Sequence, residues 1–264
     1  MAWLRELGNT GLTISAIGLG TVKLGRDQGV KYPGEFSIPD DSAARDLLAR
    51  ASDLGINLID TAPAYGNSEQ RLGQLLAGQR QQWVICSKVG EEFENGQSRF
   101  DFSPEHTRMS VERSLQRLRC DHLDIVLIHS DGNDLDIINQ RGTLEALAEL
   151  KQLGLIRAYG MSTKSVGGGL LAAATACDAL MVTYNLAEQE QEPVLDACQK
   201  SHTAVLIKKA LASGHLANDY EDPVQASMDL VFGHPACTSA IIGTINPAHL
   251  AANIAAAKRA LAVD

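Results

Sequence analysis

The chain has few cysteines, no excess of basic residues and no long hydrophobic run. Its five cysteines form no C-x-x-C pair, so the sequence predicts small core thiols in a reducing compartment rather than disulfides or a zinc site. The formal net charge of -9 argues against nucleic acid or an anionic membrane as a partner, because both attract clustered Lys and Arg. The richest apolar stretch, residues 170–182, is broken by Asp178, and the N-terminus lacks the basic start and apolar core of a signal peptide. We therefore expect a cytoplasmic protein that binds a small molecule.

Common nucleotide and metal motifs are missing as well. Lys23 stands where a G-x-G-x-x-G fingerprint beginning at Gly18 needs its third glycine, and Arg26 stands where a P-loop beginning at Gly20 needs lysine. The seven histidines show no metal-ligand spacing, and no H-x-H follows the first predicted strand. The sequence therefore predicts neither of these phosphate loops and no metal.

What the chain does have is a regular alternation of short apolar runs and helical stripes. Its 264 residues, 45% apolar and 21% charged, suit one globular domain over residues 1–264. The patterns predict strands at 16–21, 57–60, 83–88, 123–128, 156–161, 179–183, 203–207 and 238–242. They predict helices at 40–54, 67–78, 103–119, 144–154, 165–175, 188–200, 223–232 and 247–261.

Eight strand–helix units in a chain near the usual ~250 residues favour an α/β fold of the (β/α)8 TIM barrel type. Residues 3–15 alternate loosely around a Gly8–Gly11 turn, which predicts a short β-hairpin that caps the barrel. The polar segment 23–39 is predicted as a long loop, and long loops in compact domains are usually functional.

Three of the predicted strands end in polar groups. Asp60, Lys88 and His129 each follow an apolar run, and Tyr65 comes five residues after Asp60. Catalytic groups of such barrels lie at the carboxyl ends of the strands, so these four side chains are expected to meet in one site. Each has a structural alternative: Asp60 could cap a turn, Tyr65 could pack on the next helix, Lys88 could be solvated and His129 could be a hydrogen-bonded core residue.

These residues resemble a known family, the aldo-keto reductases. Residues 60–69, Asp-Thr-Ala-Pro-Ala-Tyr-Gly-Asn-Ser-Glu, are similar to that family's D-T-A-x-x-Y-G-x-x-E signature. Lys88 and His129 fall on the matching third and fourth strand ends. The resemblance continues almost end to end, through Leu7-Gly8, residues 160–162, Tyr184-Asn185, Gly243-Thr244 and Asn253. It implies a nicotinamide-dependent carbonyl reductase on a (β/α)8 barrel.

The resemblance also implies a role for each of the four residues. Hydride transfer to a carbonyl carbon builds negative charge on oxygen, so an acid must deliver a proton, and Tyr65 is the expected donor. The ammonium of Lys88 is expected to stabilise the phenolate and lower the pKa of Tyr65. Asp60 would keep Lys88 charged and oriented. A neutral His129 would orient the carbonyl oxygen by hydrogen bonding.

Cofactor positions follow from the resemblance with several substitutions. Thr163 replaces the usual Asn beside Ser162, and Met181 stands where the family has Gln. The aromatic that stacks on nicotinamide is replaced within 207–211, where a lysine stem could cover the ring while its ammonium reaches the pyrophosphate, or both lysines could be solvated. The implied cofactor positions are Thr21, Val22, Asp60, Ser162, Thr163, Met181, Lys208, Lys209, Ala210, Leu211, Gly243, Thr244, His249 and Asn253.

The resemblance implies an anion-binding site at the start of the last predicted helix, 247–261. Thr244 and Asn253 match the adenosine-phosphate region, but many relatives have Lys or Arg where this chain has Gly243 and His249. NADP is therefore the expected cofactor with NAD possible, and the alternative is a helix that is merely capped.

The substrate is less well specified. Val22, Tyr32, Phe93 and His129 are expected to line an open pocket for small aldehydes or ketones, because the chain has no long loop after His129 and almost no tail. The chain is expected to be a monomer or a weak homo-oligomer. Two alternatives remain: a nucleotide-binding redox sensor or partner subunit with negligible turnover, and a sugar or alcohol dehydrogenase that runs the reverse reaction.

Overall fold

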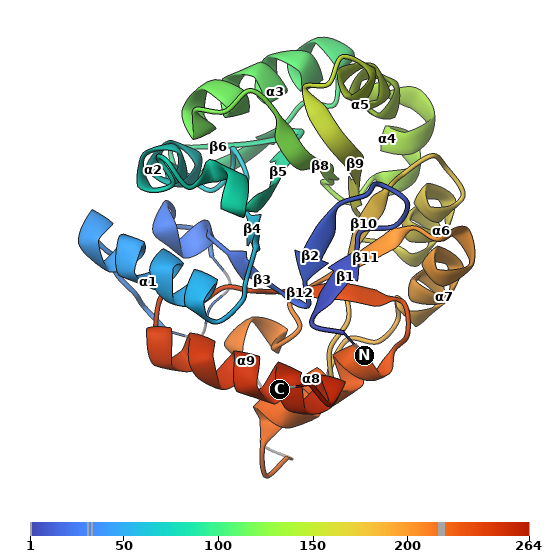
Figure 1. Cartoon of the computed structure of the whole chain (residues 1–264). Helices are drawn as coiled ribbons and strands as arrows, with labels where there is room; N and C mark the ends of the chain where they lie inside the picture. The colour runs from blue at the N-terminus through green and yellow to red at the C-terminus, as the bar shows by residue number, and fades with distance from the viewer. Residues whose placement is uncertain (1, 31, 33, 216–219, 264) are drawn as a thin grey trace.

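The computed structural model describes residues 2–30, 32, 34–215 and 220–263, and its centre is a closed barrel of eight parallel strands (Figure 1). Around the barrel the strands follow the chain order, which confirms the predicted (β/α)8 fold. Their bounds agree with the sequence prediction to within one or two residues. The strands are β3 (Ile17–Gly20), β4 (Leu58–Asp60), β5 (Val84–Val89), β8 (Leu123–His129), β9 (Ile156–Ser162), β10 (Ala179–Thr183), β11 (Ala204–Lys208) and β12 (Cys237–Ile242).

Helices form a ring outside the strands (Figure 1). The ring contains α1 (Asp41–Asp53), α2 (Ser68–Leu75), α3 (Pro104–Leu118), α5 (Thr143–Gln152), α6 (Val166–Ala173), α7 (Glu192–Ser201), α8 (Pro223–Gly233) and α9 (Pro247–Leu261). Sequence-encoded caps start several of them; Asp40 accepts from the Ala43 amide at 2.8 Å and Ser103 from the His106 amide at 3.2 Å. Across the described ranges, none of these helices has the length and hydropathy that a membrane span requires.

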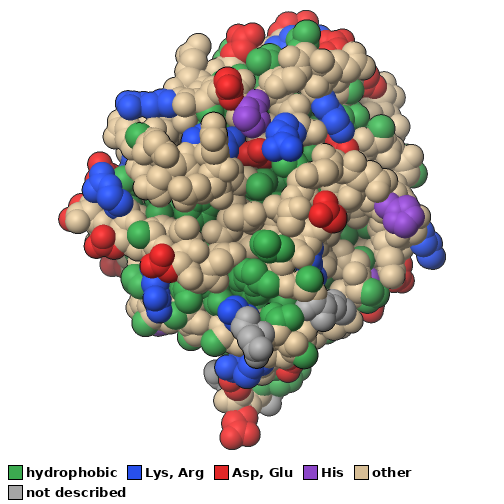
Figure 2. All heavy atoms as spheres, viewed as in Figure 1, with side chains coloured by type: hydrophobic (Ala, Val, Ile, Leu, Met, Phe, Trp, Pro, Cys, Tyr) green, Lys and Arg blue, Asp and Glu red, His purple; other side chains and the backbone are tan. Residues whose placement is uncertain are grey.

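The predicted N-terminal cap is present. Strands β1 (Leu4–Glu6) and β2 (Thr13–Ser15) pair antiparallel, and this hairpin lies across the barrel opening in Figure 1. Leu7, Leu12 and Ile14 are buried against side chains that fill the barrel interior. In the same view, Figure 2 shows Lys, Arg, Asp and Glu side chains interspersed on this face. The hairpin therefore closes one end of the barrel and leaves chemistry to the other.

The barrel strands have an inner and an outer face. Leu58, Cys86, Ile125 and Leu127 pack inside with the hairpin, whereas Ile59 packs outside against the helices. Because strand side chains alternate, residues two positions further along point inward too. The polar strand ends are such residues: Asp60 follows Leu58 by two, Lys88 follows Cys86 by two and His129 follows Leu127 by two.

The sequence analysis missed a hairpin and a helix, and it misplaced one helix start. A hairpin of β6 (Glu91–Glu94) and β7 (Gln97–Phe100) follows β5, and α4 (Asp134–Gln140) follows β8. The helix predicted from residue 188 begins at Glu192, since Asn185 holds a turn there by accepting from the amides of Ala187 and Glu188. The segment predicted as a loop from residue 23 overlaps the 3-10 turn η1 (Val22–Leu24); residues 31 and 33 lie outside the described chain.

The loop that carries Tyr65 is anchored by a close glycine–glycine contact. A side chain at Gly66 would bring its Cβ to 2.0 Å from the carbonyl oxygen of Gly25, and the φ of Gly66 is +62°. Both the contact and the left-handed backbone require glycine.

We predict that Gly66→Ala destabilises the chain by at least ~2 kcal/mol more than Gly78→Ala, because overpacking adds to the backbone strain. Gly78 is the matched control, since its φ is +78° but nothing lies within 4 Å of a Cβ there. Urea unfolding of both variants measures the difference. Equal destabilisation would show that the Gly25 contact is unimportant.

Candidate active site

The four predicted catalytic side chains line one cleft at the carboxyl end of the barrel. Asp60 ends β4, Lys88 lies near the end of β5, His129 ends β8, and Tyr65 stands on the loop after β4. The cleft has a volume of about 740 Å³ and extends past the ends of β9 to β12. The sequence-predicted cluster is thus brought together in space.

Asp60 and Lys88 form a buried ion pair. Lys88 Nζ lies 2.5 Å from Asp60 Oδ1 and also donates to the carbonyl oxygen of Thr61 at 2.9 Å. Both side chains are almost fully buried. Burial lowers the pKa of Lys88 more than any other single effect, but the charge and hydrogen bond of Asp60, together with Tyr65 and Cys86, raise the pKa overall, so Lys88 remains an ammonium.

Tyr65 lies beside this pair. Its hydroxyl donates to Asp60 Oδ2 at 3.4 Å, and Lys88 Nζ is 4.8 Å from the centre of its ring. The expected lowering of the Tyr65 pKa is wrong as a net effect. Burial raises the pKa of Tyr65 most strongly and Asp60 adds to that rise, while the Lys88 ammonium only partly offsets it. At neutral pH the phenol therefore keeps its proton.

His129 contacts a residue that the sequence analysis did not select. Its Nδ1 lies 2.7 Å from Glu91 Oε2, and its ring makes an edge contact with Tyr65 at 6.3 Å between centroids. Burial lowers the pKa of His129, as do the positive charges of Lys88 and Lys208, whereas Glu91 raises it. The net lowering leaves His129 neutral near pH 7. No motif marks Glu91, because only the unpredicted β6–β7 hairpin brings it to His129.

Most of the predicted cofactor positions share the cleft. Those that line it are Thr21, Val22, Asp60, Ser162, Met181, Lys208, Lys209, Ala210, Leu211, Gly243, Thr244, His249 and Asn253. Thr163 does not line the cleft, but its buried Oγ1 has no hydrogen-bond partner. Apolar residues such as Met181, Ala210 and Leu211 line the cleft together with the four polar residues, and its far end is the start of a helix, which suits an aromatic ring joined to phosphates. The donor set therefore fits a nicotinamide nucleotide.

Lys208 points elsewhere than the sequence suggested. Its Nζ donates to Ser162 Oγ at 2.9 Å and to the Thr163 carbonyl oxygen at 2.7 Å, so the ammonium turns toward the predicted carboxamide positions and not toward the last helix. Burial, with the charges of Lys164 and Lys209, lowers the pKa of Lys208 to about 7. The alternative of two solvated lysines does not hold for Lys208, whose ammonium is hydrogen-bonded within the protein.

The far end of the cleft is the start of α9. Asn246 caps the helix by accepting from the amides of Ala248 and His249 at 2.9 and 3.3 Å, and Thr244 Oγ1 accepts from the Asn246 amide at 3.1 Å. His249 is exposed on the first turn and Asn253 is buried one turn later. Capping and an anion site are thus compatible here, because the cap leaves the His249 side chain free to face a ligand.

Three of the four predicted substrate residues line the cleft and one does not. Val22, Tyr32 and His129 line the cleft, but Phe93 does not, because the guanidinium of Arg26 stacks on its ring at 3.3 Å. Other lining residues were not foreseen. They include Lys23, whose Nζ lies 3.6 Å from the centre of the Tyr32 ring, and the aromatic and aliphatic residues Phe36, Val224, Ile241 and Ile242.

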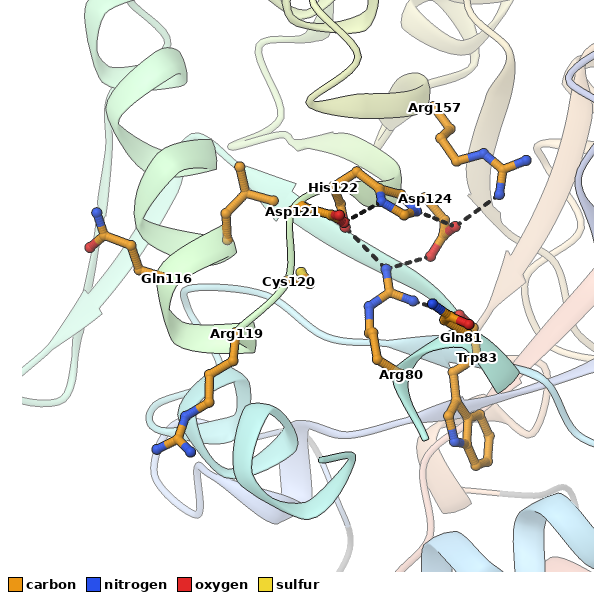
Figure 3. Close-up of a pocket in the computed structure, with 11 residues that line it drawn as sticks. Arg80, Gln81, Trp83, Gln116, Arg119, Cys120, Asp121, His122, Asp124 and Arg157 are labelled. Carbon is orange, nitrogen blue, oxygen red and sulfur yellow. Dashed lines mark hydrogen bonds and ion pairs between the residues drawn. The ribbon is translucent and has the colours of Figure 1, made fainter. Parts of the chain in front are cut away.

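A second hollow of about 810 Å³ lies near the amino ends of β5, β8 and β9 (Figure 3). There Asp124 accepts from Arg80 at 2.8 Å and from the Ile85 amide at 2.9 Å, and Arg157 lies 3.4 Å away. Figure 3 shows the side chains of Arg80, Asp124 and Arg157 directed toward one another. The four predicted catalytic residues lie at the opposite end of the barrel. We therefore interpret the charged residues that line this hollow as a cluster that stabilises the fold.

Comparison with known proteins gives a consistent result. Residues 16–231 match the model of the Aldo/keto reductase family. The fold is similar to that of a Pseudomonas aeruginosa protein assigned to the aldo-keto reductases, with a TM-score of 0.90 and 57% identity over 98% of this chain and 95% of that one. It is also similar to the holo form of an aldo-keto reductase from Bacillus halodurans, with a TM-score of 0.80 and 26% identity over 97% and 91% of the two chains.

The relatives of known activity include enzymes whose names give different substrates. The NADH-specific methylglyoxal reductase of Escherichia coli is 32% identical over 81% of this chain and 70% of its own length. The L-galactose dehydrogenase of Arabidopsis thaliana is 38% identical over 60% of this chain and 48% of its own length. The chain therefore spans between about half and 70% of these relatives.

We predict that Asp60→Asn destabilises the chain by about 3 to 5 kcal/mol, because it leaves the buried Lys88 ammonium without a counter-ion. Adding Lys88→Met to that variant should restore part of the loss. The matched control is Asp136→Asn, which removes the carboxylate from an exposed pair with Arg141 at 2.6 Å and should change stability by no more than ~1 kcal/mol. Urea unfolding at pH 7 measures all three; similar losses at Asp60 and Asp136 would contradict the prediction.

Proposed function

The chain belongs to the aldo-keto reductase family, and from that premise we propose that it reduces small carbonyl compounds to alcohols with Tyr65 as the general acid. Members of this family are NAD(P)H-dependent oxidoreductases, so carbonyl reduction as a class follows from membership. The observation that carries the assignment of Tyr65 is the position of its hydroxyl beside the Asp60–Lys88 pair and His129 in one cleft.

The geometry divides the reaction among these residues. The nicotinamide, when bound, supplies the hydride that adds to the carbonyl carbon. The Tyr65 hydroxyl gives its proton to the carbonyl oxygen, which leaves a phenolate. Lys88, 4.8 Å from the ring centre, stabilises that phenolate until solvent returns a proton. Asp60 keeps Lys88 charged and aimed, so its role is to position the lysine.

We propose that the cofactor lies along the cleft from the Tyr65 end to α9. Ser162 and Lys208 would hold the carboxamide, since the Lys208 head already reaches Ser162. Ala210, Leu211 and the Lys208 stem would cover the ring. Thr244, His249 and Asn253 would hold the adenosine phosphates, which favours NADP with NAD as the possible substitute. One relative is named NADH-specific and another carries NADP(+) in its name, so the family does not decide between them.

The reverse reaction is the second candidate function. Relatives named L-galactose dehydrogenase and D-arabinose 1-dehydrogenase are 38% and 36% identical to the parts of this chain that they match. A tyrosine that donates a proton in reduction can accept one as a phenolate in oxidation, with Lys88 stabilising that phenolate, so the same site can oxidise a sugar. A cofactor-binding subunit without turnover has no comparable support.

We predict that Tyr65→Phe lowers kcat for carbonyl reduction by at least ~100-fold while the dissociation constant for NADPH changes little, since the proton donor is lost and the cofactor cleft is kept. NADPH oxidation with a panel of aldehydes, ketones and aldoses, together with cofactor fluorescence, measures both quantities.

Tyr159→Phe is the matched control for that experiment, because Tyr159 is a buried tyrosine on β9 outside the cleft. It should turn over normally. Activity retained in Tyr65→Phe would remove Tyr65 from the acid role. Cofactor binding without turnover on any compound, in either direction, would favour a sensor.

We predict that His249→Ala weakens NADPH binding several-fold and leaves NADH binding nearly unchanged, because only NADPH carries the 2′-phosphate proposed to meet this exposed side chain. Titration of the pure protein with each dinucleotide measures the two dissociation constants. Equal effects on both cofactors would show that His249 does not read that phosphate.

A further inference from the structure

Lys208 places an ammonium group at the catalytic end of the cleft. Its Nζ donates to Ser162 Oγ at 2.9 Å and to the Thr163 carbonyl oxygen at 2.7 Å. Ser162 is the register partner of His129 across the β8–β9 pair, so the ammonium lies one strand away from the catalytic cluster. Both hydrogen-bond partners are neutral oxygens. Hydrogen bonds therefore hold the Lys208 head in place without cancelling its charge.

The charged groups around Lys208 are mostly positive. Burial lowers the pKa of Lys208 most, and Lys164, Lys209 and Lys88 lower it further, to about 7. The carboxylate that opposes them is Asp134. Its Oδ2 already accepts from the amide of Lys164 at 3.0 Å and from two groups of the next residue at 2.7 Å. The charge of Asp134 is thus shared with other donors and offsets the lysines only in part.

The two redox forms of nicotinamide differ by one charge. The ring is positive in the oxidised dinucleotide and neutral in the reduced one, whereas the phosphates are the same in both. In the proposed reaction the ring lies beside Tyr65. The charge of Lys208 lowers the pKa of His129, and that of Lys88 lowers the pKa of Lys208, so Lys208 is within electrostatic range of this place. Lys88 itself is neutralised by Asp60 at 2.5 Å.

We propose that Lys208 makes the cleft select the reduced dinucleotide over the oxidised one. This deepens the proposed function and rests on it, since it needs a nicotinamide at the Tyr65 end of the cleft. Lys208 is a specificity-determining residue and takes no part in the hydride or proton transfer. It leaves the overall equilibrium unchanged, but the oxidised cofactor departs more readily after reduction. The reverse reaction then needs a higher concentration of oxidised cofactor.

Isothermal titration calorimetry of the unaltered protein with NADPH, NADP⁺, NADH and NAD⁺ measures the selection. The ratio of the dissociation constants of the oxidised and reduced forms is compared, because the 2′-phosphate is the same in both members of a pair. At pH 6.5 we expect the oxidised form to bind about tenfold more weakly, and at pH 9 this ratio should fall several-fold as Lys208 loses its proton. His129 stays neutral and Lys88 stays charged over this range, since the pKa of the first is lowered and that of the second raised.

Two substitutions of Lys208 separate charge from packing. Lys208→Met removes the charge at similar length, so the ratio should be low at every pH. Lys208→Arg carries a charge that does not titrate, so the ratio should stay high up to pH 9. Lys200→Met is the matched control, since it removes a lysine from the exposed surface of α7 and should reproduce the curve of the unaltered protein. Thermal unfolding of each variant without cofactor checks that the fold is retained.

A ratio that does not change with pH in the unaltered protein, or one that is the same in folded Lys208→Met, would overturn the inference while leaving carbonyl reduction in place. The expected ratios without turnover of any carbonyl would support the inference and count against the proposed function. If none of the four dinucleotides binds, both are wrong.

Discussion

The ion pair of Asp60 and Lys88 is the constraint on which the site depends. Two charges almost without solvent at a barrel mouth are tolerated only when their geometry is good and their remaining hydrogen-bonding capacity is used, as the Thr61 carbonyl oxygen does for Lys88. The pair in turn determines where the Tyr65 ring lies and keeps a positive charge under it. Strand register, barrel closure and the Gly25–Gly66 contact all serve to hold these atoms in place.

The two ends of the barrel divide stability from chemistry. At one end the hairpin residues Leu7, Leu12 and Ile14 fill the opening, and Asp124 gathers arginines and a backbone amide. At the other end, charged and polar groups face a cleft, and burial shifts the pKa values of several of them. Lys208 and Tyr65 illustrate this, since burial lowers the pKa of the first and raises that of the second.

The fold and the cluster at the strand ends could be predicted because both follow from local patterns. Apolar periodicity gives the strand–helix alternation, and barrel topology then places every strand end together. What could not be predicted depends on side-chain packing between segments distant in sequence. Phe93 was assigned to the pocket without knowing that Arg26 stacks on it, the contacts of Lys208 with Ser162 and Thr163 were not foreseen, and Glu91 was missed with its hairpin. The predicted lowering of the Tyr65 pKa was wrong because the sequence does not show how deeply the side chain is buried.

The cleft carries a charge opposite in sign to the protein as a whole. The net charge of the chain is -9, yet four lysines, Lys23, Lys88, Lys208 and Lys209, line the cleft against two carboxylates, Glu35 and Asp60. A dianionic or trianionic molecule approaching the acidic exterior is therefore repelled at most points and attracted at one. Low-dielectric walls concentrate that attraction, so the electrostatic field of the protein steers an anionic molecule toward the cleft. This steering weakens as ionic strength rises.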